Sequence, residues 1–330
     1  MVNSSMTVQQ HGGDLDRAVA QFGGSRADWL DLSTGINPIP YPVPAISQDA
    51  WSRLPETSAM ARLLETARVR YGSDPSNSIV AGPGVQAFIQ LMPVGAPARS
   101  AGVLGPTYNE YAHRFEASGL DVRQTDSLEG LRGLDIVAIV SPNNPDGRIH
   151  RADDLLKLAD HVGLLLVDEA FHDTLESVSL GSRRLPENVI VLRSFGKFFG
   201  LAGVRLGFAV AHRDTGLTLE QALGPWAVSG PAIEVGTMAL GDTDWIESTC
   251  QRLKADMHRL RQLLTGVGFE LVGGTDLFVT VRHPEASAWK DRLAAAHVWV
   301  RDFDYAPDWL RFGLPGTPAR WAQLEAALTG

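Results

Sequence analysis

One lysine of this chain lies in a segment that is otherwise apolar and rich in glycine. Residues 193–208 read RSFGKFFGLAGVRLGF, so Lys197 has phenylalanine, glycine and leucine as neighbours. Burial disfavours the ammonium form of a lysine and favours the neutral amine, which is a nucleophile. Such lysines form imines with carbonyl compounds. For this segment alone, a lysine that extends out of an apolar turn into solvent is the alternative interpretation.

Groups that could bind a phosphate occur near this lysine in the sequence and after a predicted strand. Ser194 precedes Lys197 by three residues, and Arg205 follows it by eight. Residues 82–85, GPGV, follow the apolar run 77–81 and precede a helix-like segment. Backbone N–H groups at such a strand–helix junction commonly bind anions.

Three further side chains follow predicted strands. Asp168 stands at the end of the buried run 164–168, Asn143 and Asn144 come just after another run, and Tyr108 offers an aromatic face. Ligands bind at the carboxyl ends of strands in open α/β sheets, and a buried aspartate needs a cationic partner. A phosphate clamp, an aromatic ring, a buried acid and an apolar lysine together suit pyridoxal 5'-phosphate, whose ring accepts electrons when its nitrogen is protonated.

The elements that must position these residues alternate between strands and helices. We expect strands over residues 77–82, 99–105, 134–142, 164–171, 189–195 and 204–210, and helices over residues 85–92, 107–119 and 151–163. Continuous apolar runs fit strands that are covered on both faces. The pattern predicts an α/β fold with a mostly parallel sheet.

The pattern changes near residue 224. Pro231 is expected in the first turn of one long helix that continues to residue 264, because proline suits that turn. Shorter strands and helices follow, which predicts a smaller α+β domain. We therefore expect an N-terminal segment (1–44) associated with the small domain and the cleft, a large cofactor-binding domain (45–229) and a C-terminal small domain (230–330). Residues 37–44, NPIPYPVP, contain too much proline for regular structure.

Composition excludes several classes of protein. The chain has 330 residues and a net charge of −9, which argues against a general nucleic-acid-binding protein, since that would need a basic face. Its single cysteine, Cys250, cannot form an internal disulfide and is interpreted as a structural thiol. The N-terminus does not read as a signal peptide, and no apolar run reaches the roughly 20 residues of a membrane span. We expect a cytoplasmic protein.

The motifs together resemble a known family. In order, GPGV, PTY, NNPDG, DEAF, SFGK, AGVRLGF and LRFGLP are similar to the motifs of the fold-type-I pyridoxal-phosphate enzymes of the class I/II aminotransferase superfamily. The resemblance covers nearly the whole chain. It implies the aspartate-aminotransferase-like fold and a homodimer with active sites at the interface.

The resemblance also implies a role for each matching residue. Lys197 would form the imine with the cofactor and carry the proton at Cα. Asp168 would pair with the pyridine nitrogen, Asn144 would donate to the ring 3-oxygen, and Tyr108 would stack on the ring. The phosphate would be held by Ser194, Arg205 and the backbone of Gly84, Val85 and Gln86. Arg311 would bind the substrate α-carboxylate as a bidentate pair.

The chain departs from the family at two positions. Phe171 stands where many relatives have a tyrosine, so we expect one hydrogen bond to the ring oxygen to be missing. Leu54 stands where relatives often have a tyrosine that reaches the cofactor phosphate of the partner subunit. Neither change affects the chemistry of the lysine.

Within the superfamily, two groups that bind phosphorylated amino compounds are most similar. HGGD at residues 11–14, LSTGINPIP at 32–40 and PWAVSG at 225–230 resemble the L-threonine-O-3-phosphate decarboxylases of cobalamin biosynthesis. This resemblance implies that Arg301 and Arg311 bind substrate anions, with Asn37 and His11 near the substrate. It predicts decarboxylation to (R)-1-amino-2-propanol O-2-phosphate. Histidinol-phosphate aminotransferase is the alternative, because the same residues serve transamination.

Other classes fit the sequence less well. Ser194 and Lys197 have the SxxK spacing of serine acyl enzymes, but the supporting SDN and KTG motifs are absent. The acidic segment after residue 167 could hold a metal ion, through Asp168, Glu169, His172 and Asp173, although the adjacent positions are poor geometry for one ion. A catalytically inactive binding protein on this fold is a further alternative. His172 is interpreted as a structural histidine, and Trp226 is left open as a residue near the cleft.

Overall fold

The computed structural model describes residues 12–92, 98–175 and 179–330, which form two compact units. The larger unit contains the described residues of Ile36–Asp256 together with Gly273–Leu277. The smaller unit contains the described part of Met1–Gly35, Met257–Val272 and Phe278–Gly330. The division predicted from the sequence, at residues 44 and 229, stays a prediction.

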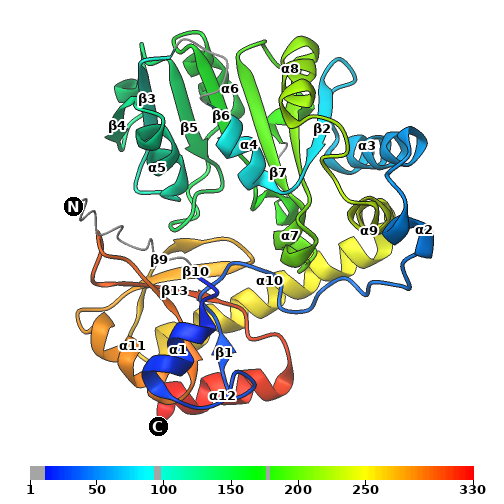
Figure 1. The fold of residues 1–330 in the computed structure, drawn as a ribbon. Coiled ribbons are helices and arrows are strands. Elements are labelled where there is room, and N and C mark those ends of the chain that lie inside the picture. The colour runs from blue at the N-terminus through cyan, green and yellow to red at the C-terminus, as the bar shows by residue number, and fades with distance from the viewer. Residues whose placement is uncertain (1–11, 93–97, 176–178) are drawn as a thin grey trace, which may run out of the picture. The chain divides into compact units, whose positions relative to one another are not determined.

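The larger unit is built on a seven-stranded sheet (Figure 1). In spatial order its strands are β2 (Ser78–Gly82), β8 (Gly207–Ala211), β7 (Val189–Ser194), β6 (Leu164–Asp168), β5 (Ile136–Val140), β3 (Ser100–Leu104) and β4 (Asp121–Thr125). β8 is antiparallel to both of its neighbours, and all other pairs are parallel. The prediction of a mostly parallel sheet is confirmed.

Apolar residues on both faces explain why these segments form central strands. Every residue of β5 and β8 is buried, as is every residue of β7 except Ser194. Helices cover the sheet, as expected when both faces of a parallel sheet are apolar. They are α3 (Thr57–Tyr71), α4 (Val85–Leu91), α5 (Glu110–Ala117), α6 (Ala152–Ala159), α8 (Arg213–Leu223) and α9 (Gly230–Gly241). One core cluster joins Phe88, Tyr111 and Phe115 of these helices to Leu166 and Leu192 of the strands.

The smaller unit is an α+β structure. Its four-stranded sheet has the order β12 (Arg301–Asp302), β13 (Trp309–Gly313), β10 (Phe278–Arg282) and β9 (Glu270–Gly274), and the last two residues of β9 are assigned to the larger unit. A two-stranded parallel pair joins β1 (Leu30–Asp31) to β11 (Val298–Trp299). Three further helices belong to it: α1 (Leu15–Phe22), α11 (Ala286–Ala295) and α12 (Pro318–Thr329). The predicted α+β character of this region is confirmed.

The single long helix predicted after Pro231 is wrong, because two helices occupy this region. Helix α9 ends at Gly241, and α10 (Thr243–Gly266) begins after Asp242. The carboxylate of Asp242 accepts a hydrogen bond from the Trp245 N–H at 3.0 Å, which satisfies one of the free amides at the start of α10. Pro231 does lie in the first turn of its helix, which Ser229 caps. No helix within the described residues has the length and hydrophobicity that crossing a membrane requires.

A buried network of charges supports the loop that follows β6. The Arg193 guanidinium contacts the carboxylates of Glu169 and Asp173, each at 3.2 Å, and all three side chains are at most 4% exposed. Arg70 contacts the same Asp173 carboxylate at 3.2 Å. The Arg193 guanidinium also lies 4.4 Å from the centre of the Tyr71 ring. The network therefore fixes residues 169–173, which come directly after Asp168.

We expect Arg193→Met to destabilise the protein by about 3–5 kcal/mol, because it leaves two buried carboxylates with fewer partners. The matched control is Arg132→Met, since Arg132 pairs with Glu129 at 3.3 Å in an exposed position and such pairs contribute little. Urea denaturation of both variants measures the difference. Equal stability of the two variants would show that the buried network contributes no more than a surface ion pair.

Candidate active site

A pocket of about 190 Å³ lies at the carboxyl ends of the parallel strands in the larger unit. All nine residues predicted to act in catalysis or cofactor binding line it: Gly84, Val85, Gln86, Tyr108, Asn144, Asp168, Ser194, Lys197 and Arg205. They come from segments up to 121 positions apart, from Gly84 to Arg205. Since strands β5, β6 and β7 are parallel, their carboxyl ends meet at one edge of the sheet.

One side of the pocket is formed where α4 begins. Gly84, which precedes α4, has a φ of +85°, and a Cβ there would lie 2.8 Å from the Arg205 guanidinium. The positive φ favours glycine at this position, and the absence of a Cβ leaves room for the guanidinium beside the backbone. Arg205 itself has a φ of +56°, an uncommon angle for a residue with a side chain. The first N–H groups of α4 have no partner within the helix, so this side offers amide donors beside a guanidinium.

Asp168 provides a buried acid at the end of β6. It is 5% exposed, its Oδ1 accepts from the Ala170 N–H at 2.9 Å, and its Oδ2 accepts from the Tyr111 hydroxyl at 2.8 Å. Burial raises the pKa of Asp168, and the hydrogen bonds from Tyr111 and Ala170 and the charge of Lys197 oppose this rise. Sequence reasoning missed Tyr111, which lies in the first turn of α5 and whose ring contacts that of Tyr108, with the ring centres 6.3 Å apart.

Lys197 lies on α7 (Phe195–Phe198), a four-residue helix whose phenylalanines are buried. Its Nζ lies 5.6 Å from the centre of the Phe171 ring, which also lines the pocket. Ser194 stands at the N-cap position of this helix, at the end of β7. Tyr108 is partly buried, and burial raises the pKa of its hydroxyl. The apolar surroundings predicted for the lysine are therefore present in the fold.

Asn37 adjoins the lysine segment rather than the pocket lining. Its backbone N–H donates to the Lys197 carbonyl at 2.9 Å, and its side chain donates to the Phe198 carbonyl at 2.9 Å. Asn143 is also bound to backbone and side chains near the strand ends, and Asn144 is the asparagine that lines the pocket.

The two arginines predicted to bind substrate anions lie together in the smaller unit. Arg301 and Arg311 face each other in register on β12 and β13. Arg311 is buried and donates from Nη2 to the Ser33 carbonyl at 2.6 Å. Burial and the neighbouring Arg301 lower the pKa of Arg311 to about 10. Two adjacent cations with this much burial favour a bound anion. The remaining predicted residue, His11, lies outside the described residues.

The residues of the pocket fit pyridoxal 5'-phosphate. The buried Asp168 carboxylate, whose pKa burial raises, gains from a cationic partner such as a protonated pyridine nitrogen. Arg205 and the amides at the start of α4 suit a phosphate. Lys197 supplies the amine that an aldehyde requires, and Tyr108 supplies an aromatic face.

The alternatives weighed from the sequence are less consistent with this geometry. Glu169 and Asp173 bind Arg193, which leaves Asp168 and His172 of the four residues considered as metal ligands. Among the described residues, the one cluster close enough for a metal ion is Glu187, His212 and Asp214, a different group on the surface.

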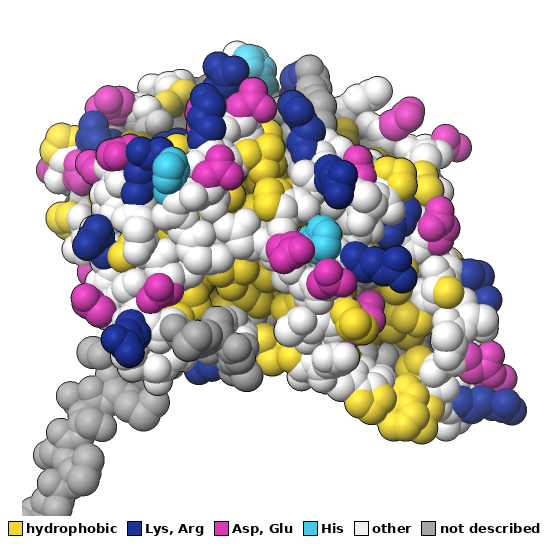
Figure 2. Space-filling model, turned by 90° about the horizontal axis from the view of Figure 1, so that it is seen from above, with side chains coloured by type: hydrophobic (Ala, Val, Ile, Leu, Met, Phe, Trp, Pro, Cys, Tyr) yellow, Lys and Arg dark blue, Asp and Glu magenta, His cyan; other side chains and the backbone are white. Residues whose placement is uncertain are grey.

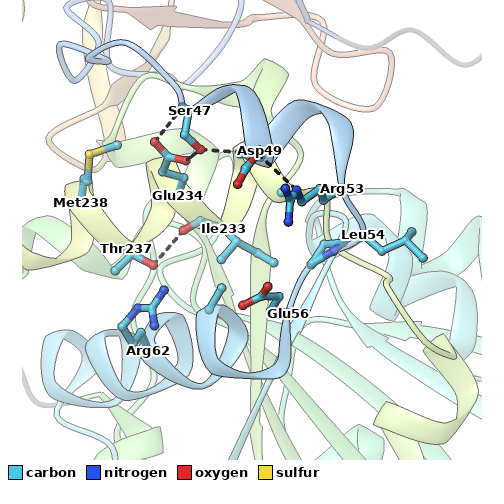
Figure 3. Close-up of a pocket in the computed structure, with 14 residues that line it drawn as sticks. Ser47, Asp49, Arg53, Leu54, Glu56, Arg62, Ile233, Glu234, Thr237 and Met238 are labelled. Atoms are coloured by element: carbon cyan, nitrogen blue, oxygen red, sulfur yellow. Dashed lines mark hydrogen bonds and ion pairs between the residues drawn. The ribbon is translucent and has the colours of Figure 1, made fainter.

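Leu54 and Trp226 do not line the cofactor pocket. Both line a separate groove of about 620 Å³ in the larger unit. A further pocket, of about 360 Å³, shares Leu54 with this groove and is shown in Figure 3. There the Ser47 hydroxyl donates to Glu234 at 2.7 Å, and Arg53 pairs with Asp49 at 3.2 Å. The interpretation that Trp226 lies near the cleft stays a prediction.

Comparison with known proteins defines the class. Residues 45–328 match the family model for aminotransferase class I and II. The chain belongs to this family and is a pyridoxal-phosphate-dependent enzyme.

Two relatives are similar over almost their whole length. A threonine-phosphate decarboxylase from Sinorhizobium is 44% identical, over 96% of this chain and 97% of that protein. A threonine-phosphate decarboxylase from Pseudomonas aeruginosa is 42% identical, over 97% of each. Among solved structures, histidinol-phosphate aminotransferase from Sinorhizobium meliloti in complex with pyridoxal-5'-phosphate has a TM-score of 0.84 at 20% identity, covering 99% of this chain and 97% of that chain. This structural similarity shows the fold.

We expect the stability of Asp168→Asn, relative to the wild-type protein without cofactor, to increase with pH. Because burial raises the folded-state pKa of Asp168, the unfolded state ionises first as the pH rises above about 3.8, and the wild-type protein loses stability until the folded pKa is passed. The asparagine variant does not share this loss. Urea denaturation from about pH 3 to pH 8 measures the difference, since the range must extend below the ordinary aspartate pKa of about 3.8.

The control for this experiment is Asp74→Asn, which should behave in the opposite way. The Ser76 hydroxyl and N–H lower the pKa of Asp74, so this carboxylate stabilises the fold above its unfolded pKa and loses that effect as the pH falls. A stability difference for Asp168→Asn that does not change with pH would contradict a raised pKa at this site.

Proposed function

We propose that the protein decarboxylates L-threonine O-3-phosphate to (R)-1-amino-2-propanol O-2-phosphate, with pyridoxal 5'-phosphate as cofactor. The observation that carries this proposal is the 42–44% identity, over nearly the full length of both chains, to two proteins named threonine-phosphate decarboxylase. The pocket supports it, because the chain has an amine, a buried acid and a phosphate clamp in one place. We further propose that the product serves cobalamin biosynthesis.

Different residues of the pocket would bind different parts of the cofactor. Ser194, Arg205 and the amides at Gly84–Gln86 would hold its phosphate, and Tyr108 would pack on the ring. Asp168 would hold a proton on the ring nitrogen, with Tyr111 fixing the carboxylate. Asn144 would donate to the ring oxygen. When bound, pyridoxal phosphate supplies an aldehyde that condenses with amines and a ring that accepts electrons from a bond broken at Cα.

Lys197 would carry the proton in the reaction. Its amine would first hold the cofactor and would be released when the substrate amine takes its place. After the bond from Cα to the carboxylate breaks and CO₂ leaves, the Lys197 ammonium would donate a proton to Cα. The apolar surroundings of Lys197 favour this exchange, because they limit competition from water.

The arginine pair of the smaller unit would bind the substrate anions. Arg311 would bind the α-carboxylate and Arg301 would bind the second anionic group, consistent with the mutual repulsion that helps to lower the pKa of Arg311. Asn37 and His11 are proposed to act near the substrate, as the resemblance implies. Transamination of a phosphorylated amine such as histidinol phosphate is the alternative, since the same lysine can remove a proton from Cα.

We also propose that the protein is a homodimer. Three large apolar side chains of the groove described above are mostly exposed: Trp51 at 65%, Leu54 at 64% and Trp226 at 59%. Contiguous apolar surface of this kind commonly marks an interaction site. On the face drawn in Figure 2, basic and acidic side chains are interspersed, and hydrophobic side chains also gather in places. The predicted cytoplasmic location stays a prediction.

Lys197→Ala should abolish the absorbance band of the lysine-bound cofactor, because alanine has no amine to form the imine. The measurement is the visible spectrum of both proteins with added pyridoxal phosphate. Lys254→Ala is a matched control, since Lys254 is an exposed lysine on α10. A band that persists in Lys197→Ala would contradict the proposed role of this lysine.

The choice between the two reactions is tested with substrate. The wild-type protein should release CO₂ from phosphothreonine without a keto acid, and Arg311→Met should raise KM or lower kcat/KM by about a hundredfold or more, because a buried charged contact is lost. Histidinol phosphate with a keto acid serves as the comparison substrate. Turnover that depends on the keto acid and releases no CO₂ would favour the aminotransferase.

A further inference from the structure

The helix that carries Lys197 cannot satisfy its own carbonyl groups. α7 has four residues, and the last four carbonyls of a helix have no partner within it. The segment Asn37–Tyr41 supplies donors for this end. The Asn37 N–H donates to the Lys197 carbonyl, the Asn37 side chain to the Phe198 carbonyl, and the Tyr41 N–H to the Phe199 carbonyl, each at 2.9 Å.

The sequence of this segment leaves it few donors. Pro38 and Pro40 have no N–H, so the backbone donors are those of Asn37, Ile39 and Tyr41. Asn37 and Tyr41 bind the lysine segment, and the Ile39 N–H binds the Asn37 side-chain oxygen at 3.1 Å. All three backbone N–H groups of this segment therefore donate to a hydrogen-bond acceptor.

Residues 37–41 lie very close to the backbone of the segment that carries Lys197. Gly200 follows the lysine segment with a φ of +66°, and a Cβ there would lie 2.6 Å from the Asn37 carbonyl oxygen. Any larger residue would push Asn37 away from α7. Residues 37–41 thus lie against the backbone around Lys197 as a fixed strap.

A charged side chain from α10, together with the Ile39 N–H and the Phe198 carbonyl, fixes the orientation of the Asn37 side-chain amide at the start of this strap. The Arg252 Nη2 donates to the Asn37 Oδ1 at 2.8 Å, and its Nη1 pairs with Asp256 at 3.3 Å. A guanidinium can only donate hydrogen bonds, so the Asn37 oxygen must face Arg252 and the nitrogen must face Phe198. Asn37 is 2% exposed, which leaves water little access to replace either bond.

We propose that Arg252 is a positioning residue for Lys197. Through Asn37 it holds the strap against α7 and so fixes the backbone from which the Lys197 side chain starts. This proposal rests on the proposed function of Lys197 as the reacting amine. It assigns a role in catalysis to a residue that does not line the cofactor pocket.

The first test uses the protein without cofactor. In Arg252→Met, amide hydrogen exchange in a peptide covering residues 36–41 should be about tenfold faster, because the charged hydrogen bond that orders the strap is lost. Arg252→Lys should restore part of the protection, since an ammonium can still donate to Asn37. The control is Lys254→Met, which changes an exposed side chain two residues away on the same helix. Exchange that is unchanged in Arg252→Met would overturn the proposal.

The second test uses the protein with bound pyridoxal phosphate. Arg252→Met should lower kcat by about tenfold to a hundredfold with a smaller change in KM, because a displaced lysine reacts poorly while substrate contacts persist. The pH midpoint of the cofactor absorbance change should shift, and Lys254→Met should leave it in place. The effects of Arg252→Met and Asn37→Ala on kcat should not add, because both act through one contact.

The outcomes separate this proposal from the function on which it rests. Faster exchange in Arg252→Met with unchanged kcat and unchanged absorbance midpoint would mean that the contact is only structural, and would overturn the positioning role alone. An absorbance band that survives Lys197→Ala would overturn both the proposed function and the positioning role. Additive effects of the two substitutions would also contradict the route through Asn37.

Discussion

The side chains of Asp168, Glu169 and Arg193 carry charges at the carboxyl ends of β6 and β7, inside an otherwise apolar unit. Much of the larger unit's structure depends on giving each of these charges a partner. Successive side chains of a strand point to opposite faces of the sheet. Asp168 at the end of β6 and Ser194 at the end of β7 therefore share the face of the pocket. Arg193 lies on the other face and meets Glu169 there. Each face has its own polar partners, so the buried acid of the pocket lies next to a separate network of ion pairs without sharing its contacts.

The strands and the site residues that follow them can be predicted from the sequence. The apolar runs predict the strands, and their ends predict where Asp168, Asn144 and Lys197 meet, because parallel strands align their carboxyl ends. The partners of these residues are not predictable in the same way. Tyr111 and Asp168 are 57 positions apart, and Arg252 and Asn37 are 215 apart. A hydrogen bond between such residues depends on the packing of a helix, which no local pattern specifies.

The break between α9 and α10 shows how a local signal can be overlooked. Apolar periodicity continues across residues 239–246 and favours one helix, yet α9 ends at Gly241 and the Asp242 carboxylate caps the start of α10. For the proline-rich residues 37–44 the sequence predicted the lack of regular structure but not the hydrogen bonds. They lack regular structure, as expected, but residues 37–41 are bound in place. Prolines that remove donors leave the few remaining amides free to cap α7.

If the proposed function holds, the choice between decarboxylation and transamination cannot come from the pocket of the larger unit. Its residues would bind cofactor groups that both reactions share. The bond that breaks at Cα is the one held perpendicular to the ring, so the discriminating groups must be those that bind the substrate's own charges. Arg301 and Arg311 are two cations in register, and the charge of Arg301 contributes to the lowered pKa of Arg311. Under the proposed function, a substrate with two anionic groups would reduce that repulsion, and the direction in which the pair would hold the carboxylate would decide which bond is aligned to break.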